Sequence, residues 1–85
     1  MIEAEVEELV RRLINDLPER CRTVFLLNRQ EGLSSREIAE ALSLSESTVR
    51  VQIKIAVDRI VGGIRTHYPD LKLVSLLLFL FTARF

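Results

Sequence analysis

Two basic residues, Arg50 and Lys54, are spaced one helical turn apart in the stretch STVRVQIKIAVDRI. At about 100° per residue, an α-helix here would place both side chains on one face together with Val51 and Ile55. Arginine and lysine donate hydrogen bonds to guanine edges or phosphates in a DNA major groove, and a valine can contact a thymine methyl group. These residues are therefore candidates for direct contact with DNA, with solvated surface charges as the plain alternative.

The start of the same helix offers groups for binding a phosphate. Ser45 and Ser47 stand beside the expected N-terminus, where hydroxyl groups and free backbone N–H groups can meet phosphate oxygens. Ile55, a β-branched residue on this face, indicates either an apolar base contact or a protein partner. Asp58, one turn beyond Lys54, would repel phosphates, so we expect DNA contact to end near Ile55.

Residues that could support catalysis are not clustered in the sequence. His67 precedes Tyr68-Pro69 without a carboxylate or thiol pattern around it, and it is interpreted as a surface or capping residue. Cys21 is the only cysteine, so it cannot form an intrachain disulfide, and it is interpreted as a small core residue. The sequence has no glycine-rich phosphate loop and no zinc-ligand spacing. We therefore expect no enzyme, no cofactor and no metal site.

Two helix starts lie close together in GLSSREIAEALSLSESTV. Ser34 is followed three residues later by a glutamate, the spacing of a capping box, and Ser45 provides the next cap. These starts predict a short helix of about Ser35–Leu42, a three-residue turn and a longer helix from Glu46 to about Ile64. Such a pair is typical of a helix-turn-helix, whose second helix enters the major groove. An ordinary helical hairpin in a small bundle is the alternative.

The rest of the chain is also predicted to be helical. Apolar residues recur at three- and four-residue steps from Ile2 to Ile14, and a second helix of about Pro18–Glu31 stops at Gly32, which can take a left-handed conformation. The long helix that starts at Glu46 is expected to weaken at Gly62-Gly63 and to stop before Pro69. No segment alternates like a strand. The fold class is therefore all-α, a small domain of four to five helices that contains a helix-turn-helix.

The apolar faces of these helices are expected to form one compact core. Ala39 is small where two helices must cross closely, and Leu44 is the expected inward anchor of the turn. The other expected core residues are Cys21, Val24, Phe25, Leu27, Ile38, Leu42, Val49, Ile53, Ala56, Val57, Ile60 and Ile64.

Length and charge limit what the chain can do alone. Its 85 residues make one domain, and 12 Lys and Arg balance 12 Asp and Glu. From Ser34 to His67 the net charge is only +1, so few phosphates can be neutralised and the isolated domain should bind DNA weakly. The acidic N-terminus is unlike a signal peptide, and a lone cysteine suits a reducing, cytoplasmic setting.

The C-terminal stretch LKLVSLLLFLFTARF would be apolar on every side if helical. It is shorter than the roughly 20 residues that span a bilayer, and it carries Lys72 and Arg84. We expect a helix-turn-helix domain over residues 1–68, with the motif at about 34–64, and an apolar helical tail over 69–85. Residues 73–85 are expected to pack across the domain and to offer a contact for a partner or for self-association; a plain core helix is the alternative.

The sequence from Leu17 to about Ile60 resembles region 4 of the extracytoplasmic-function (ECF) type of sigma-70 factors. The segments that carry the resemblance are LPERCRTVFLL, EGLSSREIAEAL and SESTVR, whose order and spacing together are specific. The resemblance implies a sigma region 4, winged-helix-like DNA-binding bundle that recognises the −35 element of promoter DNA. It also implies docking on the β flap of RNA polymerase and binding by an anti-sigma factor.

The resemblance also implies individual residue roles. Arg36, outward on the preceding helix, would lie near the DNA backbone. Many members have glycine at Ser43, which implies mild backbone strain here, and arginine at Ile55. The family's module that melts the −10 element is absent, so we expect a fragment of a longer factor. The residues that match the family's DNA-contacting positions are Arg50, Val51, Lys54 and Ile55.

Two other functions stay open from the sequence. LuxR-type response-regulator domains share the pattern EIAExLxxSxxTV, but Gln52 stands where they usually have histidine. A helix-turn-helix used only for protein interaction is favoured by the neutral net charge, by Ile55 and by the apolar tail.

Overall fold

The computed structural model describes residues 2–69 of the chain. This part contains no strand, which confirms the all-α prediction. The predicted helical tail lies outside the described residues, apart from Pro69. Four helices follow one another: α1 (Ile2–Asn15), α2 (Glu19–Arg29), α3 (Ser35–Leu42) and α4 (Glu46–His67).

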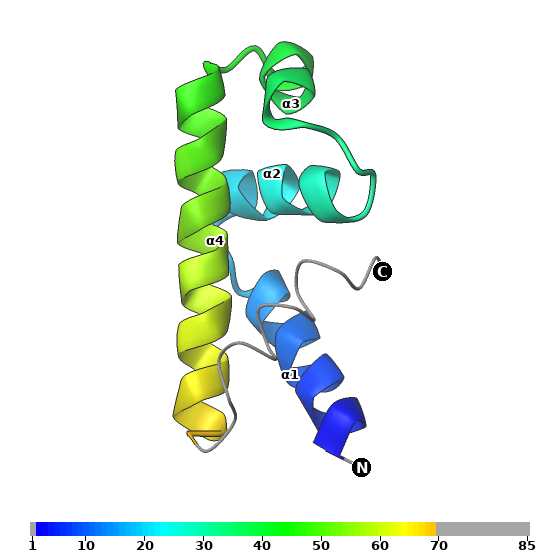
Figure 1. Cartoon of the computed structure of the whole chain (residues 1–85), viewed down its shortest axis with the longest axis vertical. Helices are drawn as coiled ribbons and strands as arrows, with labels where there is room; N and C mark the ends of the chain where they lie inside the picture. The colour runs from blue at the N-terminus through cyan, green and yellow to red at the C-terminus, as the bar shows by residue number, and fades with distance from the viewer. Residues whose placement is uncertain (1, 70–85) are drawn as a thin grey trace.

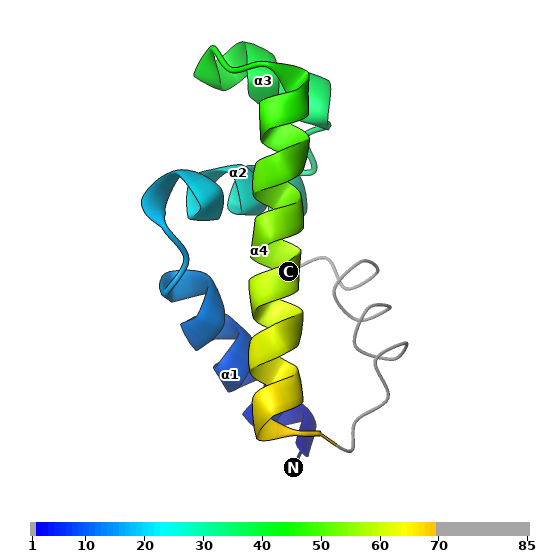
Figure 2. The same cartoon turned by 90° about the vertical axis from the view of Figure 1, so that its left-hand side faces the viewer.

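Helix α4 is the element on which the other three helices pack. Figure 1 shows α3 beside its N-terminal end, α2 across its middle and α1 along its C-terminal half, and the view in Figure 2 keeps this order. Helices α1, α2 and α3 each contact α4, and α2 also contacts α3. The N-terminal half of α4 is therefore held in place by α2 and α3.

The core consists of two clusters of buried side chains that meet on α2. The larger cluster joins α1, α2 and α4 and contains Phe25, and the smaller one joins α2, α3 and the start of α4 around Ile38 and Val49. Val24 and Phe25 are adjacent in α2 but belong to different clusters, so α2 links the two halves of the domain. Of the expected core, the buried residues are Cys21, Val24, Phe25, Ile38, Ala39, Val49, Ala56, Ile60 and Ile64. Leu27, Leu42, Leu44, Ile53 and Val57 are half-buried and pack against the clusters.

Helix α3 begins with the predicted capping box. The Ser34 hydroxyl accepts a hydrogen bond from the Glu37 backbone N–H at 3.1 Å, and the Glu37 carboxylate accepts one from the Ser34 backbone N–H at 2.9 Å. The hydrogen bonds from the backbone and the side chain of Ser34 lower the pKa of Glu37. The stabilisation that this carboxylate adds is therefore present at neutral pH and is lost as the pH falls through its lowered pKa.

The turn between α3 and α4 is closed by a left-handed residue. Ser43 has φ 55° and ψ 44°, and the Leu44 N–H donates a hydrogen bond to the Ala39 carbonyl at 2.9 Å. This is the hydrogen-bond pattern of a Schellman motif, in which glycine is the favoured left-handed residue. The strain expected at Ser43 is therefore present, because a side chain stands where the backbone favours glycine.

Replacing Ser43 with glycine should stabilise the domain. Relief of the left-handed strain, worth about 1–2 kcal/mol, outweighs the roughly 0.5–1 kcal/mol that glycine costs in chain entropy. A net gain of about 0.5–1 kcal/mol should raise the midpoint of thermal unfolding, followed by circular dichroism, by roughly 2–8 °C. Ser43→Ala is the control, since it removes the hydroxyl and keeps the strain. Equal stability of the two variants would contradict the expectation.

Helix α4 continues through Gly62 and Gly63 to His67, so the predicted weakening there is wrong. The physical reason is tertiary packing: a Cβ atom placed on Gly63 would lie 2.5 Å from Leu13 Cδ2 of α1. Glycine lets the two helices approach closely. Thr66 also donates a hydrogen bond to the Gly62 carbonyl at 2.9 Å.

The two glycines of α4 should respond differently to alanine. Gly62 has open space around its Cα, so Gly62→Ala should gain about 0.8–1 kcal/mol of helix propensity. Gly63→Ala gains the same propensity but forces the Leu13 side chain to shift, so it should gain less stability than Gly62→Ala. Urea unfolding of both variants measures the difference, and an equal gain at both positions would mean that α1 does not constrain α4 here.

The ends of α2 differ slightly from the prediction. Pro18 is the residue before the helix, with φ −54° and ψ 146°, and the helix ends at Arg29. Gly32 follows this end with φ 69°, in the left-handed conformation that was expected. The Leu33 N–H bonds the Leu27 carbonyl at 3.2 Å, which directs the chain toward α3.

Candidate nucleic-acid interface

The first turns of α4 present one exposed face, which we call the outer face and define as Ser47, Arg50, Val51 and Lys54. Val49, on the opposite side of the helix, is 0% exposed in the smaller core cluster. Val51 is 54% exposed, whereas the other large hydrophobic side chains described in residues 4–69 are buried or half-buried. The outer face thus combines two cations, a hydroxyl and an apolar side chain, the groups that suit a major groove.

Each basic side chain predicted to contact DNA is paired with a carboxylate four residues away. Arg50 Nη2 lies 2.7 Å from Glu46 Oε1, and Lys54 Nζ lies 2.8 Å from Asp58 Oδ2. Arg36 is exposed on α3, and its Nε lies 3.5 Å from Oε1 of Glu40. Solvent-exposed pairs of this kind contribute only about 0–1 kcal/mol to stability. Each carboxylate nevertheless lowers the local positive charge that a DNA phosphate would meet.

The two predicted serines have different surroundings. The Ser45 hydroxyl accepts a hydrogen bond from the Thr48 N–H at 3.1 Å and donates one to the Thr48 hydroxyl at 2.7 Å. Ser45 is therefore engaged as the cap of α4, and its hydroxyl is less available to a phosphate than predicted. The Ser47 hydroxyl lies 3.3 Å from that of Ser45 and is exposed.

Ile55 is not fully exposed, which corrects the expectation from helical periodicity. It is half-buried and packs against the larger core cluster. Ile55 lies one turn beyond Val51, directly before the buried Ala56, where the larger cluster reaches the helix. We therefore leave Ile55 out of the outer face.

The sequence interpretation missed Glu46 as a partner of Arg50. Glu46 is the first residue of α4, and its side chain is 44% exposed beside the guanidinium of Arg50. Glutamate and arginine four residues apart on a helix form ion pairs, so the spacing itself contained the signal.

The side chains of Cys21 and His67 each contact a backbone carbonyl of α4. The Cys21 thiol is buried and donates to the Gln52 carbonyl at 3.3 Å, and burial raises its pKa, although the nearby Arg59 acts in the opposite direction. His67 Nδ1 lies 2.9 Å from the Gly63 carbonyl at the end of α4. Residues 2–69 contain no group of three or more His, Cys, Asp or Glu side chains placed to hold a metal. Among the helices of these residues, none combines the length and hydrophobicity of a membrane span.

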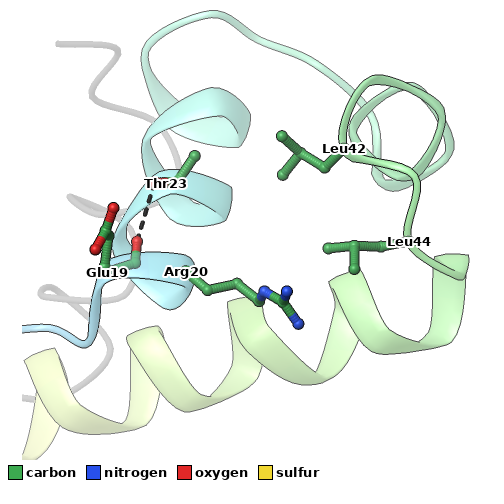
Figure 3. A pocket seen from close by; sticks show the side chains of 5 residues that line it. All are labelled: Glu19, Arg20, Thr23, Leu42 and Leu44. Atoms are coloured by element: carbon green, nitrogen blue, oxygen red, sulfur yellow. Dashed lines mark hydrogen bonds between the residues drawn. The ribbon is translucent and has the colours of Figure 1, made fainter.

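A groove of about 440 Å³ lies between the start of α2 and the α3–α4 turn. Figure 3 shows Leu42 and Leu44 on one side, Glu19 and Thr23 on α2, and the Arg20 side chain extending toward α4. Thr23 donates a hydrogen bond to the Glu19 carbonyl at 3.0 Å, which occupies its hydroxyl. The lining is part apolar and part charged, as is common for protein contacts.

A comparison with known protein families matches one continuous span of the chain. Residues 7–60 match the family model described as Sigma-70, region 4. The chain belongs to the sigma-70 region 4 family. The span of this region 4 match includes α2, α3 and the whole outer face of α4, and it confirms the resemblance seen in the sequence.

A named relative of this region 4 chain agrees with the ECF type. The "ECF RNA polymerase sigma-E factor" of Haemophilus influenzae is 40% identical to it over 53 residues, which confirms the predicted type. The alignment covers 62% of the chain and 28% of the relative, so the chain corresponds to less than a third of that protein's length. No solved structure is significantly similar to the chain.

Proposed function

We propose that the chain is the DNA-binding domain of an ECF-type sigma factor, that it recognises the −35 promoter element, and that it docks on RNA polymerase in the cytoplasm. The observation that supports this proposal best is the outer face of α4. Its basic and apolar side chains are exposed at the start of the second helix of a helix-turn-helix, while the opposite side of that helix is buried. This is the helix that enters the major groove in helix-turn-helix proteins.

Each side chain of the outer face has a contact suited to its chemistry. Arg50 donates two hydrogen bonds to one guanine, and Lys54 binds a second base edge or a phosphate. Val51 packs against a thymine methyl group. Ser47, at the N-terminus of α4, and Arg36 on α3 bind the sugar-phosphate backbone and set the register of the helix.

The local charge supports a need for polymerase. Three of the cations near the interface are already paired with carboxylates, so few phosphates can be neutralised and autonomous binding is weak. Docking on the β flap would hold the domain beside the promoter. The half-buried side chains of Leu42 and Leu44 line the groove beside α2 and would offer it a small apolar surface. Binding by an anti-sigma factor and self-association through residues 73–85 remain proposals from the resemblance and the sequence.

A chimeric factor tests the proposed function. The chain replaces region 4 of an ECF sigma factor of known promoter, and transcription is measured with core polymerase on templates randomised at the −35 position. We expect transcripts enriched in one −35 sequence that differs from that of the parent factor. Enrichment should be lost in the double variant Arg50→Ala, Lys54→Ala and retained in Arg65→Ala, a control at the other end of α4.

The chimera assay, together with binding measurements on the purified chain, separates the alternatives. Transcription without any preference at the −35 position, together with retained binding of the purified β flap, would favour a protein-interaction module. Binding of palindromic DNA as a dimer without polymerase would favour the LuxR-type function, which neither comparison supports.

A further inference from the structure

We propose that Glu46 is a specificity-determining residue: by holding Arg50, it weakens binding to DNA of arbitrary sequence more than binding to the preferred −35 site. This inference rests on the proposed function. A carboxylate beside DNA repels the phosphates, and here that repulsion is given a role in specificity.

The side chain of Glu46 is hydrogen-bonded to Arg50, the arginine of the outer face. Its Oε1 accepts a hydrogen bond from Arg50 Nη2 at 2.7 Å, and both side chains are open to solvent, at 44% and 63% exposure. Glu46 is also the first residue of α4, so its backbone is anchored by the Ser45 cap. The carboxylate therefore lies at the N-terminal end of α4, beside the outer face.

Pairing with Glu46 affects the two kinds of DNA binding differently. Binding to arbitrary sequence comes from neutralising phosphates, and a guanidinium that already has a counter-ion contributes little to it. Binding to guanine depends on the direction of the hydrogen bonds. Arginine has five N–H donors, so one can stay with Glu46 while others reach the O6 and N7 atoms of guanine. Glu46 thus removes charge from the non-specific contact and keeps the guanidinium oriented for the specific one.

The neighbouring pairs reinforce this effect. Lys54 with Asp58 and Arg36 with Glu40 repeat the same spacing, so the cations around the outer face are neutralised together. Arg50 is the arginine of the outer face, and only arginine can bind guanine through a planar fork. The role in specificity therefore belongs to its partner, Glu46.

The test uses the 85-residue chain and two fluorescent duplexes, one of random sequence and one carrying the −35 sequence selected in the chimera experiment. Binding is followed by fluorescence anisotropy between about 50 and 200 mM KCl. Glu46→Gln should tighten binding to the random duplex roughly three- to tenfold at low salt and steepen its salt dependence by up to about 0.9 in log–log slope. Binding to the selected duplex should rise less, so the ratio of the two affinities should fall about threefold or more.

Glu8→Gln is the matched control, because it removes the carboxylate of another exposed arginine pair, Glu8 with Arg11, on α1. Figure 1 shows α1 at the opposite end of α4 from Glu46, so this change should leave the ratio unaltered. Equal ratios for Glu46→Gln and Glu8→Gln, with a wild-type chain that prefers the selected duplex, would overturn the role of Glu46 alone. A wild-type chain without that preference would instead count against the proposed function.

Discussion

Replacing Phe25 with alanine is expected to remove a large part of the free energy of unfolding of the domain. Phe25 is 0% exposed in the larger core cluster, and the Arg29 guanidinium lies 5.9 Å from the centre of its ring. Truncating a buried phenylalanine costs about 3–5 kcal/mol. A domain of this size has roughly 4–13 kcal/mol in total, so the loss is a large part of its stability.

Thermal unfolding followed by circular dichroism measures this loss. Phe25→Leu keeps most of the buried volume and should cost far less than Phe25→Ala. Val51→Ala, on the exposed outer face, should change the unfolding free energy by less than about 0.5 kcal/mol. A Phe25→Ala midpoint within a few degrees of wild type would mean that Phe25 does not pack in the larger core cluster as described.

Replacing Arg50 with alanine is expected to weaken promoter recognition more than any other single change on the outer face. Loss of a bidentate guanine contact costs about 1–3 kcal/mol, or roughly 5- to 150-fold in affinity, and relaxes the preference at one base pair. Lys54→Ala should weaken all sequences about equally and reduce the salt slope by about 1 if Lys54 binds a phosphate. Competition binding with single-base variants of the selected −35 duplex separates the two effects.

Folding must be checked for these variants because both residues lie on α4. Their side chains are exposed and their ion pairs are weak, so the unfolding midpoints should stay close to wild type. Arg65→Ala is the matched control on the same helix. A uniform loss over all sequences for Arg50→Ala would assign Arg50 to a phosphate instead of a base.

Local sequence signals predicted the helix-turn-helix closely because its boundaries depend on neighbouring residues. Ser34 and Ser45 cap α3 and α4 where expected. The backbone strain at Ser43 was implied by the family resemblance, and its left-handed conformation agrees with that implication. Caps and turns form within a few residues, so one sequence contains the information needed to place them.

Features set by distant residues could not be predicted in the same way. Helix propensity indicated that α4 would weaken at Gly63, but contact with Leu13, fifty residues earlier, makes glycine the residue that fits. Periodicity assigned Ile55 to the exposed side of α4, but it could not show that the larger core cluster extends to that position. The ion pair between Glu46 and Arg50 could be predicted from the spacing of the two residues. Its location beside the outer face could be seen only in the folded structure.

Site-specific photocross-linking from Val51 tests most directly whether the outer face meets the −35 element. A photoreactive phenylalanine derivative replaces Val51 in the chimeric factor, and a second variant carries it at Thr66, which is exposed at the other end of α4. The complexes are irradiated on promoter DNA with core polymerase, and the modified nucleotides are mapped. We expect cross-links from position 51 confined to the −35 region and none there from position 66. Cross-links from position 51 to protein alone, in complexes that still transcribe, would contradict DNA recognition by this face of α4.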